Sequence, residues 1–445
     1  MVFDQVAALP IDAERARVFE HGWQSWSPTG TYPAAATSPR PDSADRRQGS
    51  YRPETPAPDT GFQGEGLLAV DPGDGGPVRV FAASAPEAVP SIRATLAGGE
   101  LLVSADGPVD QLALDGPLDA ALAGWATGFA GKAGVGPVRP APTVWCSWYH
   151  YFRDVTEADI AENVAALGGA DLPVDVVQID AGWEAEVGDW LLLSDRFASL
   201  DEPIRRIRGA GRRAGIWVAP FAVAAGSVLA REHPEWLIGA PDGAPTPAGQ
   251  WYDQPLYGLD ATHPGAAGYL RRVFGGLAES GIDYFKIDFL YAGAVTGSRH
   301  GGLDAVAGYR AGLQLIRDAI GPDSYLLGCG APVLPSVGLF DAMRVSPDTA
   351  PHYEPDRGDV TQPGQRSATL ATVARAWQHG RFWVNDPDCL IVRPAVERRA
   401  EWAALVARYG GLRASSDRIA DLDEWGLATT RRLLSEVPPP TPFAG

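Results

Sequence analysis

"DYFKIDFLYAG", residues 283–293, is the stretch that best indicates the fold of this chain. Its first half is rich in residues that favour β-strands, and apolar strands of this kind are usually buried on both faces, as in parallel sheets. Yet Lys286 and Asp288 stand two residues apart within it. Because side chains two apart on a strand share a face, we expect both to point into one cavity at the end of a buried strand.

Similar short apolar runs recur along the chain and alternate with amphipathic segments. They lie at 143–149, 174–180, 215–221, 283–289, 324–330, 341–348, 381–388 and 412–417. Eight β-α units over roughly 300 residues predict an α/β fold, a (β/α)8 TIM barrel. The segment "APVLPSVGLF" between the fifth and sixth runs is too short for a full helix. An open doubly wound sheet is the alternative, disfavoured because no glycine-rich phosphate turn follows the first run.

The residues before this alternating pattern have a different composition. Residues 1–138 are rich in Pro, Gly, Ala and Ser, and short runs such as "VRVFAAS" and "ELLVSA" predict a small N-terminal β domain. We therefore expect three parts: the β domain (1–138), a catalytic barrel (139–437) and a C-terminal tail (438–445).

Composition excludes several classes of partner. The net charge of −18 argues against binding to nucleic acid or to an anionic membrane. Neither a signal-peptide pattern nor a run of 18 apolar residues is present, so we expect a cytoplasmic protein. Cys146, Cys329 and Cys389 do not resemble a disulfide framework and are interpreted as buried thiols.

Two aspartates near strand ends are the candidate catalytic residues. We expect Lys286 to lower the pKa of Asp288 and so to keep a carboxylate ionised as a nucleophile. Asp348, in "RVSPDTAP", follows Arg344 by four residues and is the candidate acid, as a carboxyl without a lysine can hold its proton. Glycoside cleavage with retention needs such a pair about 5–5.5 Å apart. The structural alternatives are a buried ion pair for Lys286 and Asp288, and a turn for Asp348.

The second feature of the sequence that indicates a function is its tryptophan content, 14 residues in the chain. Sugar rings stack their C–H faces on aromatic side chains, so tryptophans among polar neighbours predict a sugar site, although core packing is the simpler reading for each one alone. The candidates are Trp23 and Trp26 in "HGWQSWS", Trp148 and Tyr149 in "WCSWYHYF", and Trp217 in "GIWVAPF". No zinc-type histidine spacing, EF-hand loop or phosphate loop is present, so we expect no metal.

Taken together, the motifs resemble glycoside hydrolase family 36, the α-galactosidases, and in particular its compact bacterial and archaeal branch. The resemblance runs through residues 143–395 and is carried by "WCSWYHYF", "QIDAGWEAEVGDWL", "GIWVAPF", "DYFKIDFLYAGAV", "GCGAPVLPSVGLFDAMRVSPDTAP" and "RFWVNDPDCLIVRP". It implies a retaining exo-acting α-glycosidase that releases terminal α-linked galactose, with a β-sandwich before the barrel. It also implies a carbohydrate substrate and no cofactor.

The resemblance also implies roles for individual residues. Asp288 matches the nucleophile and Asp348 the acid/base, while Lys286 and Arg344 match sugar-binding residues. The remaining matches are pocket positions: Asp180, Trp217, Cys329, a tryptophan of "GWQSW", and Trp148 or Tyr149.

One departure affects the expected specificity. The family usually has two consecutive aspartates after the second strand, and here the second is Ala181. Loss of a hydroxyl-binding group weakens discrimination between sugars. The alternatives are therefore a transglycosidase that uses the same aspartates, or a non-catalytic sugar-binding homologue.

Overall fold

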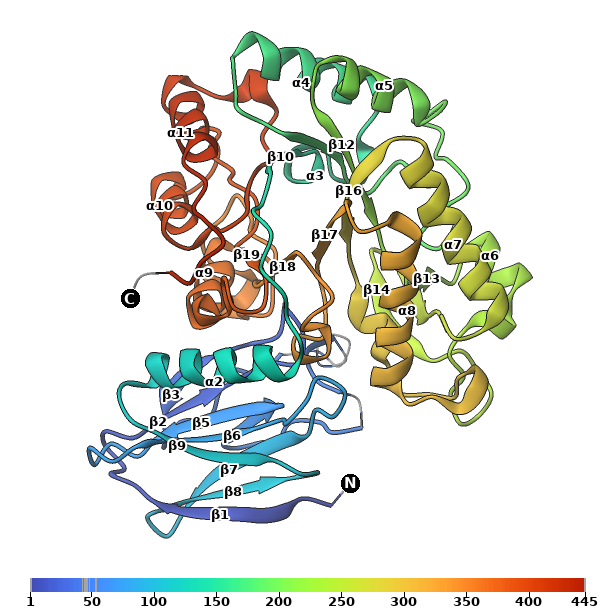
Figure 1. The fold of residues 1–445 in the computed structure, drawn as a ribbon. Coiled ribbons are helices and arrows are strands. Elements are labelled where there is room, and N and C mark those ends of the chain that lie inside the picture. Colours follow the sequence, from blue (N-terminus) through green and yellow to red (C-terminus); the bar gives the residue numbers. More distant parts are fainter. Residues whose placement is uncertain (1, 42, 44–46, 48, 53, 444–445) are drawn as a thin grey trace.

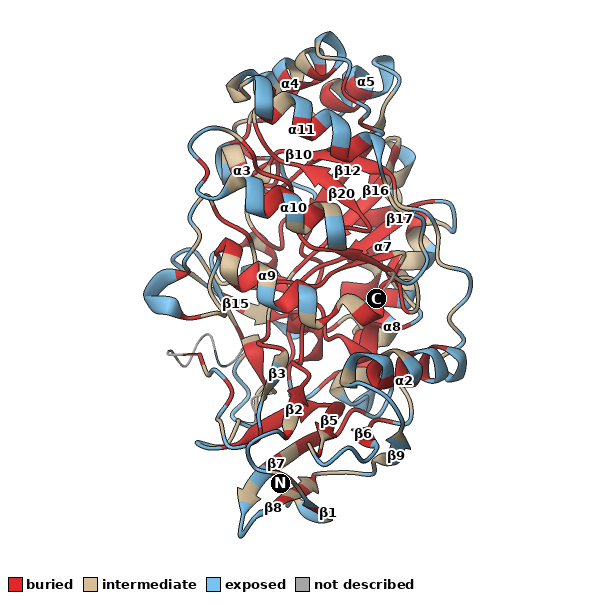
Figure 2. Ribbon diagram, turned by 90° about the vertical axis from the view of Figure 1, so that its left-hand side faces the viewer, coloured by how far each residue is buried: buried red, intermediate tan, exposed pale blue. Residues whose placement is uncertain are grey.

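The computed structural model describes residues 2–41, 43, 47, 49–52 and 54–443. Figure 1 shows two stacked parts: antiparallel sheets at the bottom and a ring of strands and helices above them. In Figure 2 the strands of the upper part are buried, while the helices expose their outer faces. No helix in the described part of the chain has the length and apolar character needed to cross a membrane.

The upper part is an eight-stranded parallel sheet in the order β19-β18-β17-β16-β12-β11-β10-β20. Its strands are β10 (Thr143–Cys146), β11 (Val176–Ile179), β12 (Arg213–Val218), β16 (Ile282–Ile287), β17 (Tyr325–Gly328), β18 (Ala342–Arg344), β19 (Val384–Asp386) and β20 (Arg413–Ser415). A parallel bridge from Leu390 to Ser415 spans the gap between β19 and β20. The predicted (β/α)8 barrel is thus confirmed, and the open doubly wound alternative is wrong because the sheet nearly closes on itself.

Helices follow most of the strands and cover the outside of the ring. They are α3 (Trp148–Tyr151), α4 (Glu157–Gly169), α5 (Asp201–Gly209), α6 (Val228–Glu232), α7 (Pro264–Glu279), α8 (Ala305–Ile320), α9 (Gln365–Ala374), α10 (Arg399–Tyr409) and α11 (Glu424–Ser435). Helix α4 begins with a capping box, in which the Thr156 and Asp159 side chains accept hydrogen bonds from each other's backbone N–H groups.

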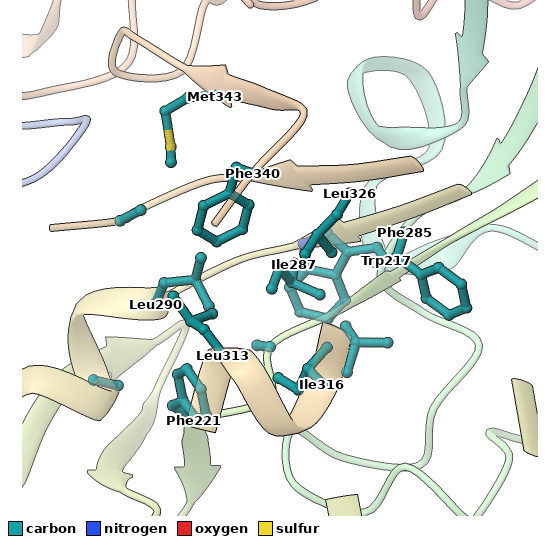
Figure 3. Packing of buried hydrophobic residues seen from close by; sticks show 14 of the residues in the cluster. Trp217, Phe221, Phe285, Ile287, Leu290, Leu313, Ile316, Leu326, Phe340 and Met343 are labelled. Atoms are coloured by element: carbon teal, nitrogen blue, oxygen red, sulfur yellow. The ribbon is translucent and has the colours of Figure 1, made fainter. Parts of the chain in front are cut away.

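Strand β16 shows how the alternation of side chains divides the barrel. Phe285 and Ile287 belong to the apolar layer that also contains Leu313 and Ile316 of α8 (Figure 3). On the other face, Tyr284 stacks on Tyr325 of β17 with ring centroids 5.7 Å apart. Lys286 shares that inner face, and Asp288 follows it just beyond the end of the strand.

Two connections in the barrel are unusual. After β12 the chain forms a small antiparallel sheet that we did not predict, made of β13 (Ala222–Ala224), β14 (Pro247–Trp251) and β15 (Gln254–Gly258). Between β17 and β18 there is only a 3₁₀ turn, Leu334–Ser336, as the short segment predicted. A bridge from Gln24 to Pro332 brings the segment 23–27 of the N-terminal part against this connection.

The N-terminal part contains two antiparallel sheets around a shared apolar core, in agreement with the predicted β-sandwich-like architecture. Their orders are β1-β8-β7-β4 and β3-β2-β5-β6-β9. The strands are β1 (Asp4–Pro10), β2 (Arg17–Glu20), β3 (Gly30–Pro33), β4 (Phe62–Glu65), β5 (Leu67–Asp71), β6 (Val78–Ala82), β7 (Ser91–Ala97), β8 (Glu100–Ala105) and β9 (Asp110–Leu114).

Helix α2 (Leu118–Lys132), which we did not predict, lies between the five-stranded sheet and the barrel (Figure 1). Its Trp125 meets Trp377 of the barrel edge-on, with ring centroids 5.8 Å apart. At the other end of the chain, Phe443 of the tail stacks on His379 at 4.0 Å. Residues 444 and 445 of the predicted tail lie outside the described residues.

Candidate active site

The predicted catalytic and binding residues follow or end the barrel strands at one rim of the ring. Asp288 comes directly after β16, Asp180 after β11 and Cys329 after β17, while Trp217 lies near the end of β12. Arg344 ends β18, and Asp348 lies four residues further on. All carboxyl ends of a parallel barrel meet at the same rim, so the fold brings these distant residues together.

Asp288 is buried and held by two hydrogen bonds. Its Oδ2 accepts from the Trp217 indole N–H at 3.0 Å, and its Oδ1 accepts from the Phe289 backbone N–H at 2.7 Å. Burial raises the pKa of Asp288 above its ordinary value, with a further contribution from the charge of Asp348, while Lys286 and the Trp217 bond oppose the rise. The two candidate catalytic carboxylates are therefore close enough to interact electrostatically.

Lys286 has a different partner from the one we expected. Its Nζ lies 3.0 Å from Asp180 Oδ2, and that oxygen also accepts from Gln178 Nε2 at 2.6 Å. Burial disfavours the ammonium, but the attraction of Asp180 and the other negative groups around it raises the pKa of Lys286 well above its ordinary value. As predicted, Lys286 lowers the pKa of Asp288, but burial of the carboxylate raises that pKa by more, so the net shift is upward.

Arg344 is shared among three carboxylates. Its Nη1 donates to Asp348 Oδ1 at 2.8 Å, its Nη2 lies 2.6 Å from Asp388 Oδ1, and its Nε lies 3.5 Å from Asp386 Oδ2. We expected Asp348 to have no lysine beside it, and its cationic partner is Arg344, the arginine four residues before it. The side chain of Asp348 is one-third exposed, whereas Asp386 and Asp388 are buried. Asp348 is thus the carboxylate of this cluster that a ligand can reach from the mouth of the barrel, the opening at the carboxyl ends of its strands.

Asp388 is a buried member of this cluster and is paired with Arg344. Burial raises its pKa to about 7, against the attraction of Arg344. Its Oδ2 accepts a short hydrogen bond from the Tyr149 hydroxyl and another, of 2.7 Å, from the Thr349 N–H. The predicted sugar contact Tyr149 is therefore bonded to a protein carboxyl and nearly fully buried. Asp388 has a positive φ of 99°, a conformation that non-glycine residues rarely adopt and that clusters at functional sites.

Aromatic side chains wall the mouth. Trp217 and Trp148 both stack on Trp251 of the β14–β15 hairpin, at 5.8 Å and 5.9 Å between ring centroids, and Phe289 meets Trp251 edge-on at 5.4 Å. Sequence reasoning missed Trp251, because it stands in the polar hairpin "GQWYDQ" far from any predicted strand. The feature that could have identified Trp251 from the sequence is its position among polar neighbours.

The two tryptophans of "GWQSW" have different surroundings. Trp26 packs edge-on against Phe289 at 5.1 Å, and its indole Nε1 is buried without a hydrogen-bond partner among the described residues. Trp23 belongs to the apolar core and lies under the Arg52 guanidinium, 5.6 Å from the ring centroid. The structure therefore brings Trp26, and not Trp23, against the rim residue Phe289.

Cys329 and Ala181 are both fully buried. Burial raises the pKa of the Cys329 thiol well above its ordinary value, and the nearby Asp288 charge adds to this. Ala181 packs in the apolar core. Glu184, which we had not singled out, is buried close by: burial raises its pKa to about 8, the Asp180 charge contributes, and its Oε2 accepts from Gly182 N at 3.0 Å.

Within the described residues, no group of three or more His, Cys, Asp or Glu side chains is arranged to hold a metal ion. The site instead consists of acidic and basic side chains in two clusters: Lys286 with Asp180 at the floor, and Arg344 with its three aspartates at the side. Asp288 lies among these groups with tryptophans as walls. This combination of fold and site is that of a glycoside hydrolase.

The comparisons with known proteins agree. The melibiase family matches residues 138–305. The α-galactosidase of Thermus thermophilus, in a structure with p-nitrophenyl α-D-galactopyranoside, is 30% identical, with 98% of this chain and 92% of that chain covered and a TM-score of 0.81. Its structure with stachyose gives a TM-score of 0.83 at the same identity, with 98% and 96% covered. This chain belongs to the melibiase family of α-galactosidases.

More distant relatives match over shorter stretches. The α-galactosidase of Escherichia coli is 33% identical over 138 residues, which are 29% of this chain and 18% of that protein. The matched segments span only 10% to 21% of the first curated relatives. The family 36 α-galactosidase AgaA of Geobacillus stearothermophilus shares the fold at 14% identity, with a TM-score of 0.63 over 96% of this chain and 61% of that chain.

Proposed function

We propose that this protein is a retaining α-galactosidase that removes terminal α-linked galactose from oligosaccharides. The observation that carries the proposal is the pair of Asp288 and Asp348 at one barrel rim: Asp288 is buried, Asp348 is one-third exposed, and the charge of Asp348 helps to raise the pKa of Asp288. The relatives bound to galactosides support galactose as the sugar.

In this mechanism Asp288 attacks the anomeric carbon while Asp348 gives a proton to the leaving oxygen. A covalent galactosyl-enzyme forms with inverted configuration. Water then attacks from the opposite face, with Asp348 as the base, and the original configuration is restored. The hydrogen bonds from Trp217 and from the Phe289 N–H fix one orientation of the Asp288 carboxylate.

The remaining charged groups serve to bind the sugar. Lys286 and Asp180 form the buried floor, and the ammonium of Lys286 has three N–H donors, of which Asp180 Oδ2 accepts one, so the others suit the hydroxyls of the terminal galactose. Arg344 orients Asp348, and Trp26 offers an indole N–H that has no partner in the part of the chain that the structure describes. Because Ala181 is buried in the core, it presents no surface to a sugar.

Azide rescue tests the two roles separately. In Asp288→Ala, azide can replace the nucleophile, and we expect β-galactosyl azide from an aryl α-galactoside. In Asp348→Ala, azide attacks the galactosyl-enzyme, and we expect α-galactosyl azide. Asp386→Asn is the matched control, because it alters a carboxylate of the same cluster without replacing a catalytic group. Wild-type turnover that persists in Asp288→Ala without azide would refute the assignment.

A further inference from the structure

Asp388 is connected to Asp348, the candidate acid/base, by two routes. Its Oδ2 accepts a hydrogen bond of 2.7 Å from the backbone N–H of Thr349, the residue after Asp348. Its Oδ1 lies 2.6 Å from Nη2 of Arg344, whose Nη1 donates to Asp348 Oδ1 at 2.8 Å. One oxygen of Asp388 therefore holds the backbone next to Asp348, and the other holds the guanidinium that bonds the Asp348 side chain.

The other contacts of Asp388 fix its own carboxylate. Oδ2 also accepts the short hydrogen bond from the Tyr149 hydroxyl, and Oδ1 accepts from the Cys389 N–H at 2.6 Å. The backbone N–H of Asp388 donates to Asp386 Oδ1 at 2.9 Å. Because each carboxylate oxygen has two donors, the side chain is held in both its position and its rotation.

Folding stability does not account for an aspartate at position 388. Its φ of 99° is a conformation that glycine adopts freely and other residues adopt with strain. The carboxylate is also costly to bury, since burial raises the pKa of Asp388 to about 7, and a buried ion pair adds little to stability. Asp388 has no exposed surface and so cannot contact a sugar itself. Its value to the protein lies in the groups that it holds.

The segment that carries Asp348 needs such support. Strand β18 ends at Arg344 and helix α9 begins only at Gln365, so Asp348 stands in the long connection between them. The Asp348 carbonyl accepts from the Gly364 N–H at 2.9 Å, but its carboxylate is one-third exposed. A general acid must lie within hydrogen-bond distance of the leaving oxygen, and a displacement of about 1 Å can slow a reaction on the order of 100-fold. The bonds from Asp388 restrict this displacement.

We propose that Asp388, supported by Tyr149, is a positioning residue for Asp348. It keeps the Asp348 carboxyl aligned with the oxygen of the bond that is cleaved, and neither Asp388 nor Tyr149 binds the sugar. This inference rests on the proposed function and adds to it two residues that act through the acid/base.

The test compares two substrates that share the galactosyl unit and differ in the leaving group. Phenolate is a basic anion that needs a proton as it leaves, whereas fluoride is a weak base that needs little help. In Asp388→Asn we expect the ratio of kcat/KM for phenyl α-galactoside to kcat/KM for α-galactosyl fluoride to fall roughly ten- to hundredfold. In Tyr149→Phe, which removes one of the four donors, we expect a fall of roughly three- to tenfold. Loss of a sugar contact would slow both substrates alike and leave the ratio unchanged.

A double variant separates positioning from a general loss of structure. In Asp348→Ala the acid is absent, so the addition of Asp388→Asn should leave the ratio at the value that Asp348→Ala alone gives. A purely structural role of Asp388 would instead add its own effect to that of the first substitution.

Two matched controls alter similar groups away from Asp348. Asp417, after β20, is a buried aspartate that accepts from the Val392 N–H at 2.6 Å and from Arg393 Nη1 at 2.8 Å. Tyr309 on α8 is a buried tyrosine whose hydroxyl lies 2.7 Å from Ser336 Oγ. Asp417→Asn and Tyr309→Phe should lower the melting temperature but keep the wild-type ratio.

An unchanged ratio in Asp388→Asn, or a ratio in the double variant that falls below that of Asp348→Ala, would overturn the inference. If Asp388→Asn does not fold, Tyr149→Phe decides: a lower ratio supports the inference and an unchanged ratio overturns it. Failure of the wild type to cleave either galactoside would instead refute the proposed function.

Discussion

The ammonium of Lys286 lies 3.0 Å from the carboxylate of Asp180, across the mouth of the barrel, and not against its sequence neighbour Asp288. This buried pair connects β16 to the end of β11. It leaves Asp288 with hydrogen bonds from Trp217 and its own backbone but with no direct ion pair among the described residues. The pairing has consequences for stability and for catalysis.

Removing one partner of this pair should destabilise the protein strongly. In Lys286→Met the Asp180 carboxylate remains buried without its cation, and we expect the free energy of unfolding to fall by about 3–5 kcal/mol, with partial recovery in Lys286→Met/Asp180→Asn. Urea denaturation measures both. The control is Arg213→Met, which breaks the partly exposed pair with Asp283 on β12 and β16 and should cost less than ~1 kcal/mol. Equal losses in the two variants would contradict the buried pairing.

The Trp217 hydrogen bond should set the acidic limb of the pH profile. Burial raises the pKa of Asp288, and the bond from Trp217 opposes that rise. In Trp217→Phe the pKa of Asp288 therefore rises further, and the loss of kcat/KM on acidification should begin at a higher pH than in the wild type. Trp190→Phe is the matched control, because Trp190 packs edge-on against Trp217 and belongs to the same aromatic group. An acidic limb that stays in place in Trp217→Phe would show that the bond does not matter.

Arg375 should position Trp26 from the interior. It is fully buried and donates to the carbonyl oxygens of Gln24, Ser25, Ser27 and Val345 at 2.6–3.2 Å. Burial lowers its pKa to about 9. In Arg375→Ala the carbonyls lose their donor, and we expect a higher KM for galactosides and partial rescue by added guanidinium.

The control for this experiment is Arg381→Ala, since Arg381 is partly exposed and donates to Trp377 and Thr127 but to none of the carbonyls that Arg375 holds, as far as the described residues show. Guanidinium should not improve that variant. If Arg375→Ala lost stability but kept the wild-type KM, Arg375 would support the fold alone.

Glu184 should make stability depend on pH. Burial raises its pKa in the folded protein to about 8, from an ordinary value of 4.5. The folded state keeps a proton that the unfolded state loses, so this residue lowers the free energy of unfolding by up to ~1.4 kcal/mol per pH unit as the pH rises between these two values. Above pH 8 the loss is complete.

Glu184→Gln cannot ionise and should lose this slope, which urea denaturation at several pH values would show. Glu186→Gln, in the same loop but partly exposed, serves as the control. Parallel stability curves for wild type and Glu184→Gln would mean that Glu184 is ionised in the folded protein.

The barrel could be predicted well because each of its buried strands is marked by a short apolar run in the local sequence. Strands buried on both faces must be apolar along their whole length, and each of the eight predicted runs overlaps an observed barrel strand. Helix α2 was missed because Gly124, Gly128 and Gly131 weaken its helical signal, so that packing against the barrel has to stabilise it. The β13–β15 sheet was missed because β14 contains Pro247 and Gly249, which weaken its strand signal, and because β13 pairs with β15, a strand distant in the chain.

For the site, the sequence by itself determined which chemical groups stand at the strand ends, since the order of strands in a barrel follows the order of the chain. The tertiary structure alone decided their partners: Lys286 with Asp180, Arg344 with Asp348 and Asp388, and Trp251 between Trp148 and Trp217. The physical reason is that ionisation and stacking depend on distances of a few ångströms and on burial. Residues far apart in the chain determine these distances and this burial. The spacing of residues along the sequence therefore does not reveal them.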